Sequence, residues 1–239
     1  MKQMAIRKKE YHFKNSIEVE EYVDGRFGAR GNKRTEKKKA TPEQVKKQNQ
    51  LNKAKNCRRR IKNNFSEGDY YITLTFKKEL RPPDLKSAKD IWTKIQRKLR
   101  DEYKKHGIPF KWIISIERGS KGAIHFHLIL NRIENGDKLL HRLWKYGGIY
   151  FRLLYEEGGF KDLADYMTKL PEEGEESYYS HSRNLPIPEP KTKVVRNSQK
   201  EPKPYKGYYI DKNTIVEGIN PITGYPYRHY EMIRINRRM

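Results

Sequence analysis

Two apolar segments joined by a short glycine-bounded loop constrain the fold of this chain more than any other feature. The first is FKWIISIE (110–117), the second is GAIHFHLIL (122–130), and RGSKG connects them. Both segments are rich in β-branched and aromatic residues, which favours strands, and a loop this short favours a β-hairpin. Because the strands of a hairpin run antiparallel, the pair excludes an all-parallel sheet.

The remaining apolar patterns predict further strands and helices around this hairpin. Alternating residues predict strands at 69–76 and 148–155. Apolar positions spaced three and four apart predict an amphipathic helix at 84–105, a short helix around 139–144 and another at 160–170. The expected fold class is therefore α+β, a largely antiparallel central sheet flanked by helices.

Changes in composition divide the chain into three expected parts. Residues 1–65 are expected to form a basic N-terminal arm and helix, and residues 66–181 to form the main α+β domain. Residues 182–204 are rich in proline and lysine, and the segment after them looks like a small hairpin. Residues 182–239 are accordingly expected to be an extended arm followed by a C-terminal β unit.

The charge of the chain indicates the class of its partner. The 239 residues include 53 Lys and Arg against 30 Asp and Glu, a net charge of +23. The polyanion that such an excess most favours is a nucleic-acid backbone, because each Lys or Arg placed on a phosphate releases counterions. An anionic membrane surface is the competing interpretation. The sequence has no run of eighteen apolar residues and no apolar signal segment at its start, and it has one cysteine, Cys57, so we expect a cytoplasmic protein without a membrane span or a disulfide.

A basic segment at 41–63 is expected to form a helix. Thr41 is placed as its N-cap, Pro42 follows at the first helical position, and Gln44 completes a capping box. This helix is either a solvated surface helix or one that contacts phosphates of an origin duplex. The candidate DNA-binding residues are Lys46, Lys47, Lys53, Lys55, Arg58, Arg59, Arg60 and Lys62.

Two histidines in the second strand of the hairpin are candidate metal ligands. Side chains alternate along a strand, so His125 and His127 project from one face while Phe126 turns to the other. The hairpin brings Glu117 level with them, and two imidazoles with one carboxylate suit Mg²⁺ or Mn²⁺. The alternatives are surface or core histidines without a metal, and an ordinary strand-end carboxylate beside Arg118.

A downstream pair of polar residues supplies a candidate nucleophile. Tyr166 and Lys169 lie three apart in the expected helix 160–170, which would place them on one face. A tyrosine hydroxyl is a weak nucleophile, and Lys169 could lower its pKa or hold a phosphate oxygen. The alternative is an amphipathic surface pair without a catalytic role.

The order of these motifs resembles the HUH endonuclease superfamily, and specifically the rolling-circle replication initiators of plasmids and phages. The strand TLTF, the Glu–His-hydrophobic-His hairpin and the helical Tyr-x-x-Lys occur in that order, and the resemblance covers roughly residues 60–190. It implies that Glu117, His125 and His127 hold the metal and that Tyr166 attacks a phosphate of single-stranded DNA, with Lys169 one turn later. The implied product is a 5′-phosphotyrosine bond and a free 3′-hydroxyl.

Two departures from that pattern leave alternatives open. Positions 162, 163, 169 and 170 carry no second tyrosine, and the chain has no Walker A loop, so we expect a separate helicase and polymerase as partners. A single-tyrosine transposase or relaxase would use the same chemistry. A non-catalytic nucleic-acid-binding module is the alternative from a different class, and it predicts no metal dependence and no covalent product.

Overall fold

The computed structural model describes residues 6–23, 40–119, 122–155, 160–171, 175–195, 201–220 and 225–235. The chain divides into two compact units, which we describe separately. The central unit comprises Lys46–Ile187, and the terminal unit combines Met1–Val45 with Pro188–Met239. Each unit holds a five-stranded antiparallel sheet, and four α-helices are described, so the expected α+β class is confirmed.

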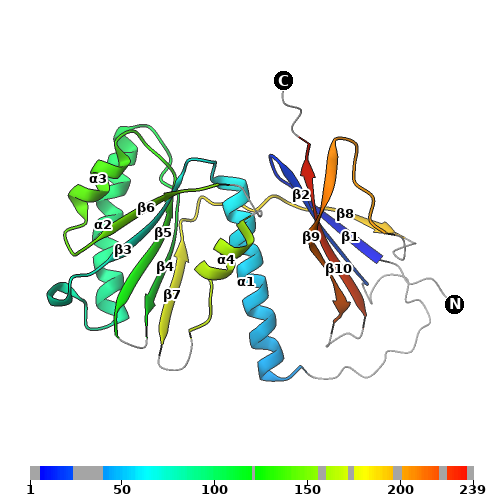
Figure 1. The fold of residues 1–239 in the computed structure, drawn as a ribbon, viewed down its shortest axis with the longest axis horizontal. Helices are drawn as coiled ribbons and strands as arrows, with labels where there is room; N and C mark the ends of the chain where they lie inside the picture. Colours follow the sequence, from blue (N-terminus) through cyan, green and yellow to red (C-terminus); the bar gives the residue numbers. More distant parts are fainter. Residues whose placement is uncertain are drawn as a thin grey trace. The chain divides into compact units, whose positions relative to one another are not determined.

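The sheet of the central unit contains the predicted hairpin at its middle. Its strand order is β6-β3-β5-β4-β7, and every neighbouring pair is antiparallel (Figure 1). The hairpin is formed by β4 and β5, and β7 was not predicted from the sequence. The strands are β3 (Tyr70–Thr75), β4 (Trp112–Arg118), β5 (Ile124–Leu130), β6 (Ile149–Leu153) and β7 (Glu176–His181).

One face of this sheet is closed by the helices α2 (Leu85–Lys105) and α3 (Gly136–Leu143), as Figure 1 shows. A short 3-10 turn at Lys78–Leu80 precedes α2, and the Asp84 side chain caps this helix by accepting from the Ser87 backbone N–H at 2.7 Å. The apolar stripe of α2, including Trp92 and Leu99, packs with Phe126 in the main core. This packing fixes Phe126 inward, and therefore fixes which face of β5 carries the histidines.

The opposite face is covered in part by α1 (Pro42–Asn64) and α4 (Lys161–Met167). The predicted capping box of α1 is present, because the Gln44 backbone N–H donates to Thr41 Oγ1 and the Thr41 N–H donates to Gln44 Oε1. A second core joins both helices to the sheet. Its buried members are Cys57, Ile61, Phe65, Ile113, Ile129, Leu154, Phe160, Ala164, Met167 and Leu185.

The terminal unit is built from both ends of the chain. Its strand order is β8-β1-β2-β10-β9. Residues 6–23, which the sequence predicted as part of a basic arm, form two paired strands because Ile17 and Val19 pack with Tyr230 and Met232 in a small core. Most of the basic stretch before Thr41 lies outside the described residues. The strands are β1 (Ile6–His12), β2 (Ser16–Val23), β8 (Lys191–Val195), β9 (Tyr208–Ile219) and β10 (Pro226–Arg234).

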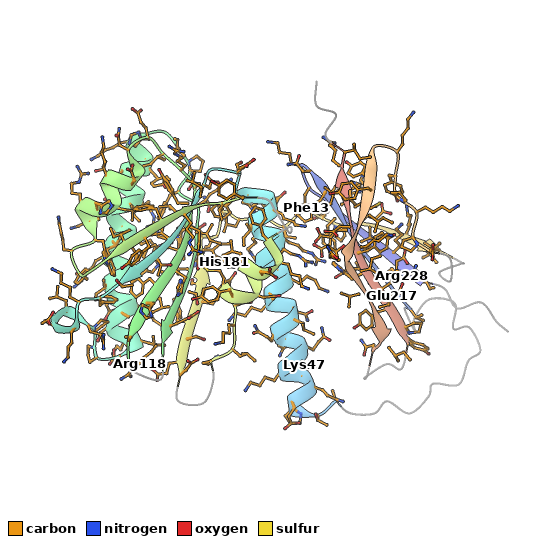
Figure 2. All side chains as sticks on the ribbon, in the orientation of Figure 1. Phe13, Lys47, Arg118, His181, Glu217 and Arg228 are labelled. Atoms are coloured by element: carbon orange, nitrogen blue, oxygen red, sulfur yellow. The ribbon has the colours of Figure 1, made fainter. Side chains whose placement is uncertain are left out.

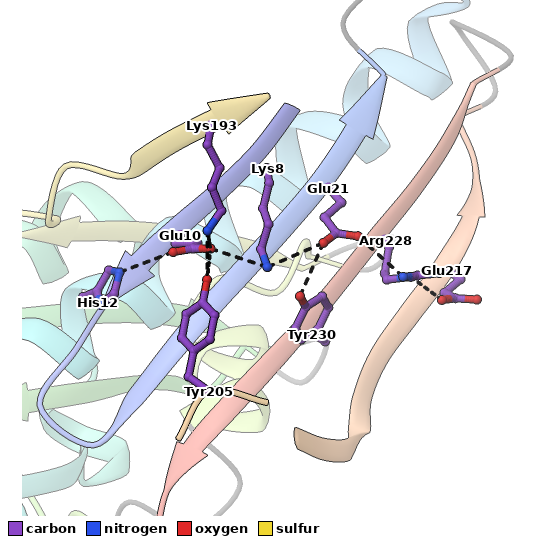
Figure 3. A network of polar contacts seen from close by, with 9 residues as sticks. All are labelled: Lys8, Glu10, His12, Glu21, Lys193, Tyr205, Glu217, Arg228 and Tyr230. Atoms are coloured by element: carbon purple, nitrogen blue, oxygen red, sulfur yellow. Dashed lines mark hydrogen bonds and ion pairs between the residues drawn. The ribbon is translucent and has the colours of Figure 1, made fainter. Parts of the chain in front are cut away.

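A polar network crosses one face of the terminal sheet (Figure 3). Buried Glu10 accepts from Tyr205 Oη at 2.5 Å and pairs with Lys193 Nζ at 2.9 Å. Farther along the sheet, Arg228 pairs with both Glu21 and Glu217, and Figure 2 also shows Arg228 and Glu217 side by side. The network supplies each of these carboxylates with a cation, which stabilises charges drawn away from water.

Candidate active site

The face of the central sheet opposite α2 carries a band of polar side chains at its middle. The register pairs Glu117 of β4 with His125 of β5, and Ser115 with His127. Glu117, Ser115 and both histidines therefore project from the same face, as the hairpin predicted. On the other side of β5, Thr73 of β3 pairs with His127, which extends the band across three strands.

His127 lies at the centre of this band and both of its ring nitrogens have polar neighbours. Nδ1 lies 3.2 Å from Tyr71 Oη and 3.3 Å from Thr73 Oγ1. Nε2 lies 2.8 Å from Tyr166 Oη and 3.9 Å from Glu117 Oε2. The ring is thus held from the β3 side, while its other nitrogen points to the tyrosine and the carboxylate.

Burial sets the protonation state of the histidines. It lowers the pKa of His127 to about 4, an effect to which nearby His125 adds. Burial also lowers the pKa of His125, together with the charge of Arg81. Neutral imidazoles keep a lone pair for a metal ion or for a proton, and both uses require it.

Tyr166 reaches the band from α4. Ala164 and Met167 of this helix are buried in the second core, which leaves Tyr166 facing His127 with about 40% of its surface exposed. Burial raises the pKa of the Tyr166 phenol, and the negative charge of Glu117 raises it further. The tyrosine therefore carries its proton at neutral pH and has to lose it before or during any attack.

Lys169 does not share a helical face with Tyr166. The helix ends at Met167, because Thr168 bonds back to the Ala164 carbonyl and Pro171 disfavours helical geometry at the residue before it. Lys169 instead lines a small pocket with Glu117. Burial raises the pKa of Glu117, and the positive charge of Lys169 opposes that increase.

A cleft of about 810 Å³ opens beside the tyrosine. One wall includes Tyr166, His127, Tyr71 and Thr73. The opposite wall is strand β6 at the edge of the sheet. The sequence did not identify Tyr71 and Thr73 as neighbours of His127, since only their i, i+2 spacing on one strand hinted at a common face.

The donor set at the centre of the site fits a divalent ion. Two donors that share one ion, each about 2.0–2.3 Å from it, lie roughly 3–4.5 Å apart. Glu117 Oε2 and His127 Nε2 meet that condition at 3.9 Å. Ligand atoms of Glu117, His125 and His127 do not all lie within 4.8 Å of one another, so a three-ligand site here requires a side chain to rotate.

A different group of candidate ligands lies in the terminal unit. Glu18 and Glu231 are directly opposite in the register of β2 and β10, and both are buried. His229 Nε2 lies 3.3 Å from Glu18 Oε1, and the ligand atoms of all three residues lie within 4.8 Å of one another. This group could hold a metal ion, and the sequence did not reveal it because its members are more than two hundred positions apart.

The candidate DNA-binding residues of α1 differ widely in exposure. Lys46 and Lys47 are exposed, and Figure 2 labels Lys47 on this helix. Lys53, Lys55 and Arg60 are half-buried, and Arg58, Arg59 and Lys62 are buried. The amino-terminal part of the helix is therefore the part that presents lysines to a phosphate backbone.

No helix among the described residues is both long enough and apolar enough to cross a membrane. This finding concerns the helices alone.

Comparisons with known proteins bear on the central unit. Residues 69–171 match a family model of replication-associated proteins, the one described by the protein ORF2. A search of curated proteins and a search of solved structures each gave no match to the chain. The matched segment begins at β3, ends after α4 and contains Glu117, His125, His127, Tyr166 and Lys169, so the match supports replication initiation as the role of the part of the chain that holds the candidate site.

Proposed function

We propose that the protein initiates rolling-circle replication by nicking and rejoining single-stranded DNA through a tyrosine of the HUH endonuclease type. The observation that carries this proposal is the position of Tyr166 Oη, 2.8 Å from His127 Nε2 and beside Glu117 in one cleft. A hydroxyl nucleophile, an imidazole and a carboxylate in contact are the parts that phosphoryl transfer to a protein side chain requires.

Tyr166 supplies the nucleophile of this reaction. Its oxygen forms a bond to the phosphorus of a phosphodiester, and the bond between phosphorus and the 3′-oxygen breaks. The phenol proton leaves Tyr166, and the departing 3′-oxygen takes up a proton to become a hydroxyl. The DNA stays attached through a 5′-phosphotyrosine, which keeps the energy of the broken bond for rejoining.

His127, His125 and Glu117 are proposed to hold Mg²⁺ or Mn²⁺. The ion would polarise a non-bridging phosphate oxygen and so stabilise the charge that develops there. Tyr71 and Thr73 orient the His127 ring through Nδ1, which is how ligating histidines are commonly fixed. Lys169, next to Glu117, is positioned to hold a second phosphate oxygen.

The experiment that tests this function looks for the covalent product. The purified protein is incubated with Mn²⁺ and a labelled pool of single-stranded oligonucleotides of random sequence, and the products are separated on a denaturing gel. We expect a labelled band at the mass of the protein, absent in Tyr166→Phe and retained in Tyr155→Phe, an exposed tyrosine outside the cleft lining. An adduct that persists in Tyr166→Phe would show that another residue is the nucleophile. DNA binding without any adduct would indicate a non-catalytic module.

A further inference from the structure

The cleft beside Tyr166 has a second wall that the proposed reaction does not use. This wall is β6, the edge strand of the central sheet, which contributes Ile149, Tyr150, Phe151 and Arg152 to the lining. Phe151 packs against the main core. Tyr150 and Arg152 alternate with it and therefore point to the face that carries the histidines.

The register places Tyr150 and Arg152 in line with the residues of the site. Tyr150 pairs with Thr73, and Thr73 pairs with His127, so the three residues form one row across β6, β3 and β5. Arg152 pairs with Tyr71 in the same way. With neighbouring strands about 4.8 Å apart, the backbone of Tyr150 lies roughly 10 Å from that of His127.

Tyr150 presents an aromatic surface to solvent. It is 63% exposed, although it is a large ring within a regular strand. Its position follows from Gly148, where an added Cβ would lie 3.2 Å from Tyr150 Cε2 and 3.4 Å from its hydroxyl. The ring therefore lies along the glycine backbone at the mouth of the cleft and packs little with other side chains.

Arg152 adds a positive charge to the same wall. Its side chain is exposed, and within the described part of the chain no carboxylate lies close enough to form an ion pair with it. An exposed ring and an unpaired guanidinium on one face of a strand match the two components of single-stranded nucleic acid, because bases stack on aromatic rings and phosphates pair with arginine.

We infer that this wall is a subsite for one nucleotide of single-stranded DNA, whose base stacks on Tyr150 and whose phosphate pairs with Arg152. The inference deepens the proposed function, on which it rests for the identity of the strand as substrate. The cleft volume of about 810 Å³ lies within the range of roughly 300–1,000 Å³ that small-molecule sites occupy, which suits one nucleotide. Duplex DNA does not fit this role, since its bases already stack on one another.

The test measures binding without cleavage. The full-length protein is kept in EDTA, and its affinity is measured by fluorescence anisotropy for oligothymidylate and for a strand of the same length with abasic sugars. We expect Tyr150→Ala to weaken binding of oligothymidylate by about 5-fold to 150-fold, the effect of one stacked base. The same variant should leave the affinity for the abasic strand unchanged, which a folding defect would not do. Equal losses on both strands, or no loss on either, would overturn the subsite.

Two further variants complete the design. Arg152→Ala should weaken binding of both strands and reduce the slope of log K against log salt by about 1. Tyr155→Ala, an exposed tyrosine outside the cleft lining, should behave as wild type. A Tyr150-dependent preference for bases together with no covalent adduct would overturn the nuclease and keep the subsite. An adduct whose yield and binding ignore Tyr150 would do the reverse.

Discussion

The hydroxyl of Tyr166 and the Nε2 atom of His127 lie 2.8 Å apart. The same nitrogen lies 3.9 Å from the Glu117 carboxylate, where it would share an ion with it. A neutral imidazole has one lone pair, so Nε2 cannot accept from the tyrosine and bind a metal at the same time. The proposed nucleophile and the proposed cofactor therefore compete for one atom, and metal binding would release the tyrosine toward the substrate.

This competition predicts that Tyr166→Phe binds Mn²⁺ more tightly than the wild type does. The variant removes a hydrogen bond that metal binding must otherwise break, and such a bond contributes a net free energy of about 0.5–1.5 kcal/mol. The dissociation constant for Mn²⁺ should fall by about 2-fold to 10-fold, measured by isothermal titration calorimetry or by the electron paramagnetic resonance of free Mn²⁺.

Tyr71→Phe provides the matched control with the opposite sign. Its hydroxyl contacts Nδ1, and removing it loosens the orientation of the ring without freeing Nε2. We expect weaker Mn²⁺ binding in this variant. If Tyr166→Phe also weakened Mn²⁺ binding, the tyrosine would support the metal site and the competition would be disproved.

The core of the candidate site could be predicted from the sequence because its parts lie close together in the chain. The hairpin brings Glu117 level with His125 through local pairing alone, and the core-facing Phe126 fixes the face. The end of α4 could not be placed as well, because helix termini depend on single contacts such as the bond from Thr168 to Ala164. Lys169 was therefore assigned to a helical face that it does not occupy.

The terminal sheet could not be predicted for a different reason. Strands β1 and β2 are rich in Lys and Glu, so their alternation does not separate an apolar face from a polar one. Their apolar partners, Tyr230 and Met232, come from the opposite end of the chain. Long-range pairing between distant segments leaves no local periodicity, which also explains why Glu18, His229 and Glu231 were not recognised as a group.

Gly147 is predicted to be intolerant of any side chain. An added Cβ would lie 2.2 Å from the Thr75 carbonyl oxygen and 2.9 Å from the Lys77 backbone nitrogen, where the chain closes onto the end of β3. Because both atoms belong to the backbone, they cannot move aside as a flexible side chain would. We expect Gly147→Ala to lower the free energy of unfolding by about 1–3 kcal/mol, measured by urea denaturation.

The control for this substitution is Gly119→Ala. An added Cβ there meets only the Ala123 carbonyl oxygen at 4.0 Å, an ordinary contact distance. Its unfolding midpoint should match that of the wild type. A Gly147→Ala protein as stable as Gly119→Ala would mean that the approach to β3 is looser than the structure has it.

Glu10 predicts that the terminal unit loses stability in acid. Burial alone would raise the pKa of Glu10, but hydrogen bonds from Tyr205 and Lys193 outweigh it and lower the pKa below the ordinary value of 4.5. A lowered pKa means that the folded state favours the ionised carboxylate. Its stabilisation is complete above the ordinary pKa and is lost as pH falls through the lower, folded-state pKa.

Substitution separates this effect from general acid denaturation. Glu10→Gln should lower the thermal midpoint at pH 7 and flatten the decrease in stability below about pH 4.5, followed by circular dichroism. Glu201→Gln removes an exposed carboxylate of the same unit and should retain the wild-type pH profile. A Glu10→Gln profile as steep as that of the wild type would show that Glu10 does not contribute to acid sensitivity.

The exposed lysines at the start of α1 predict a measurable part of the salt dependence of DNA binding. Lys46 and Lys47 are both exposed, and each phosphate contact changes the slope of log K against log salt by about 0.7–0.9. Replacing both with alanine should reduce the magnitude of the slope by about 1–2 for any DNA sequence, because phosphate contacts carry no base preference. The control replaces Lys94 and Lys98 of α2, which are exposed on a helix that covers the other face of the central sheet. Equal changes in the two double variants would mean that the overall charge of the protein, and not α1, sets its affinity for DNA.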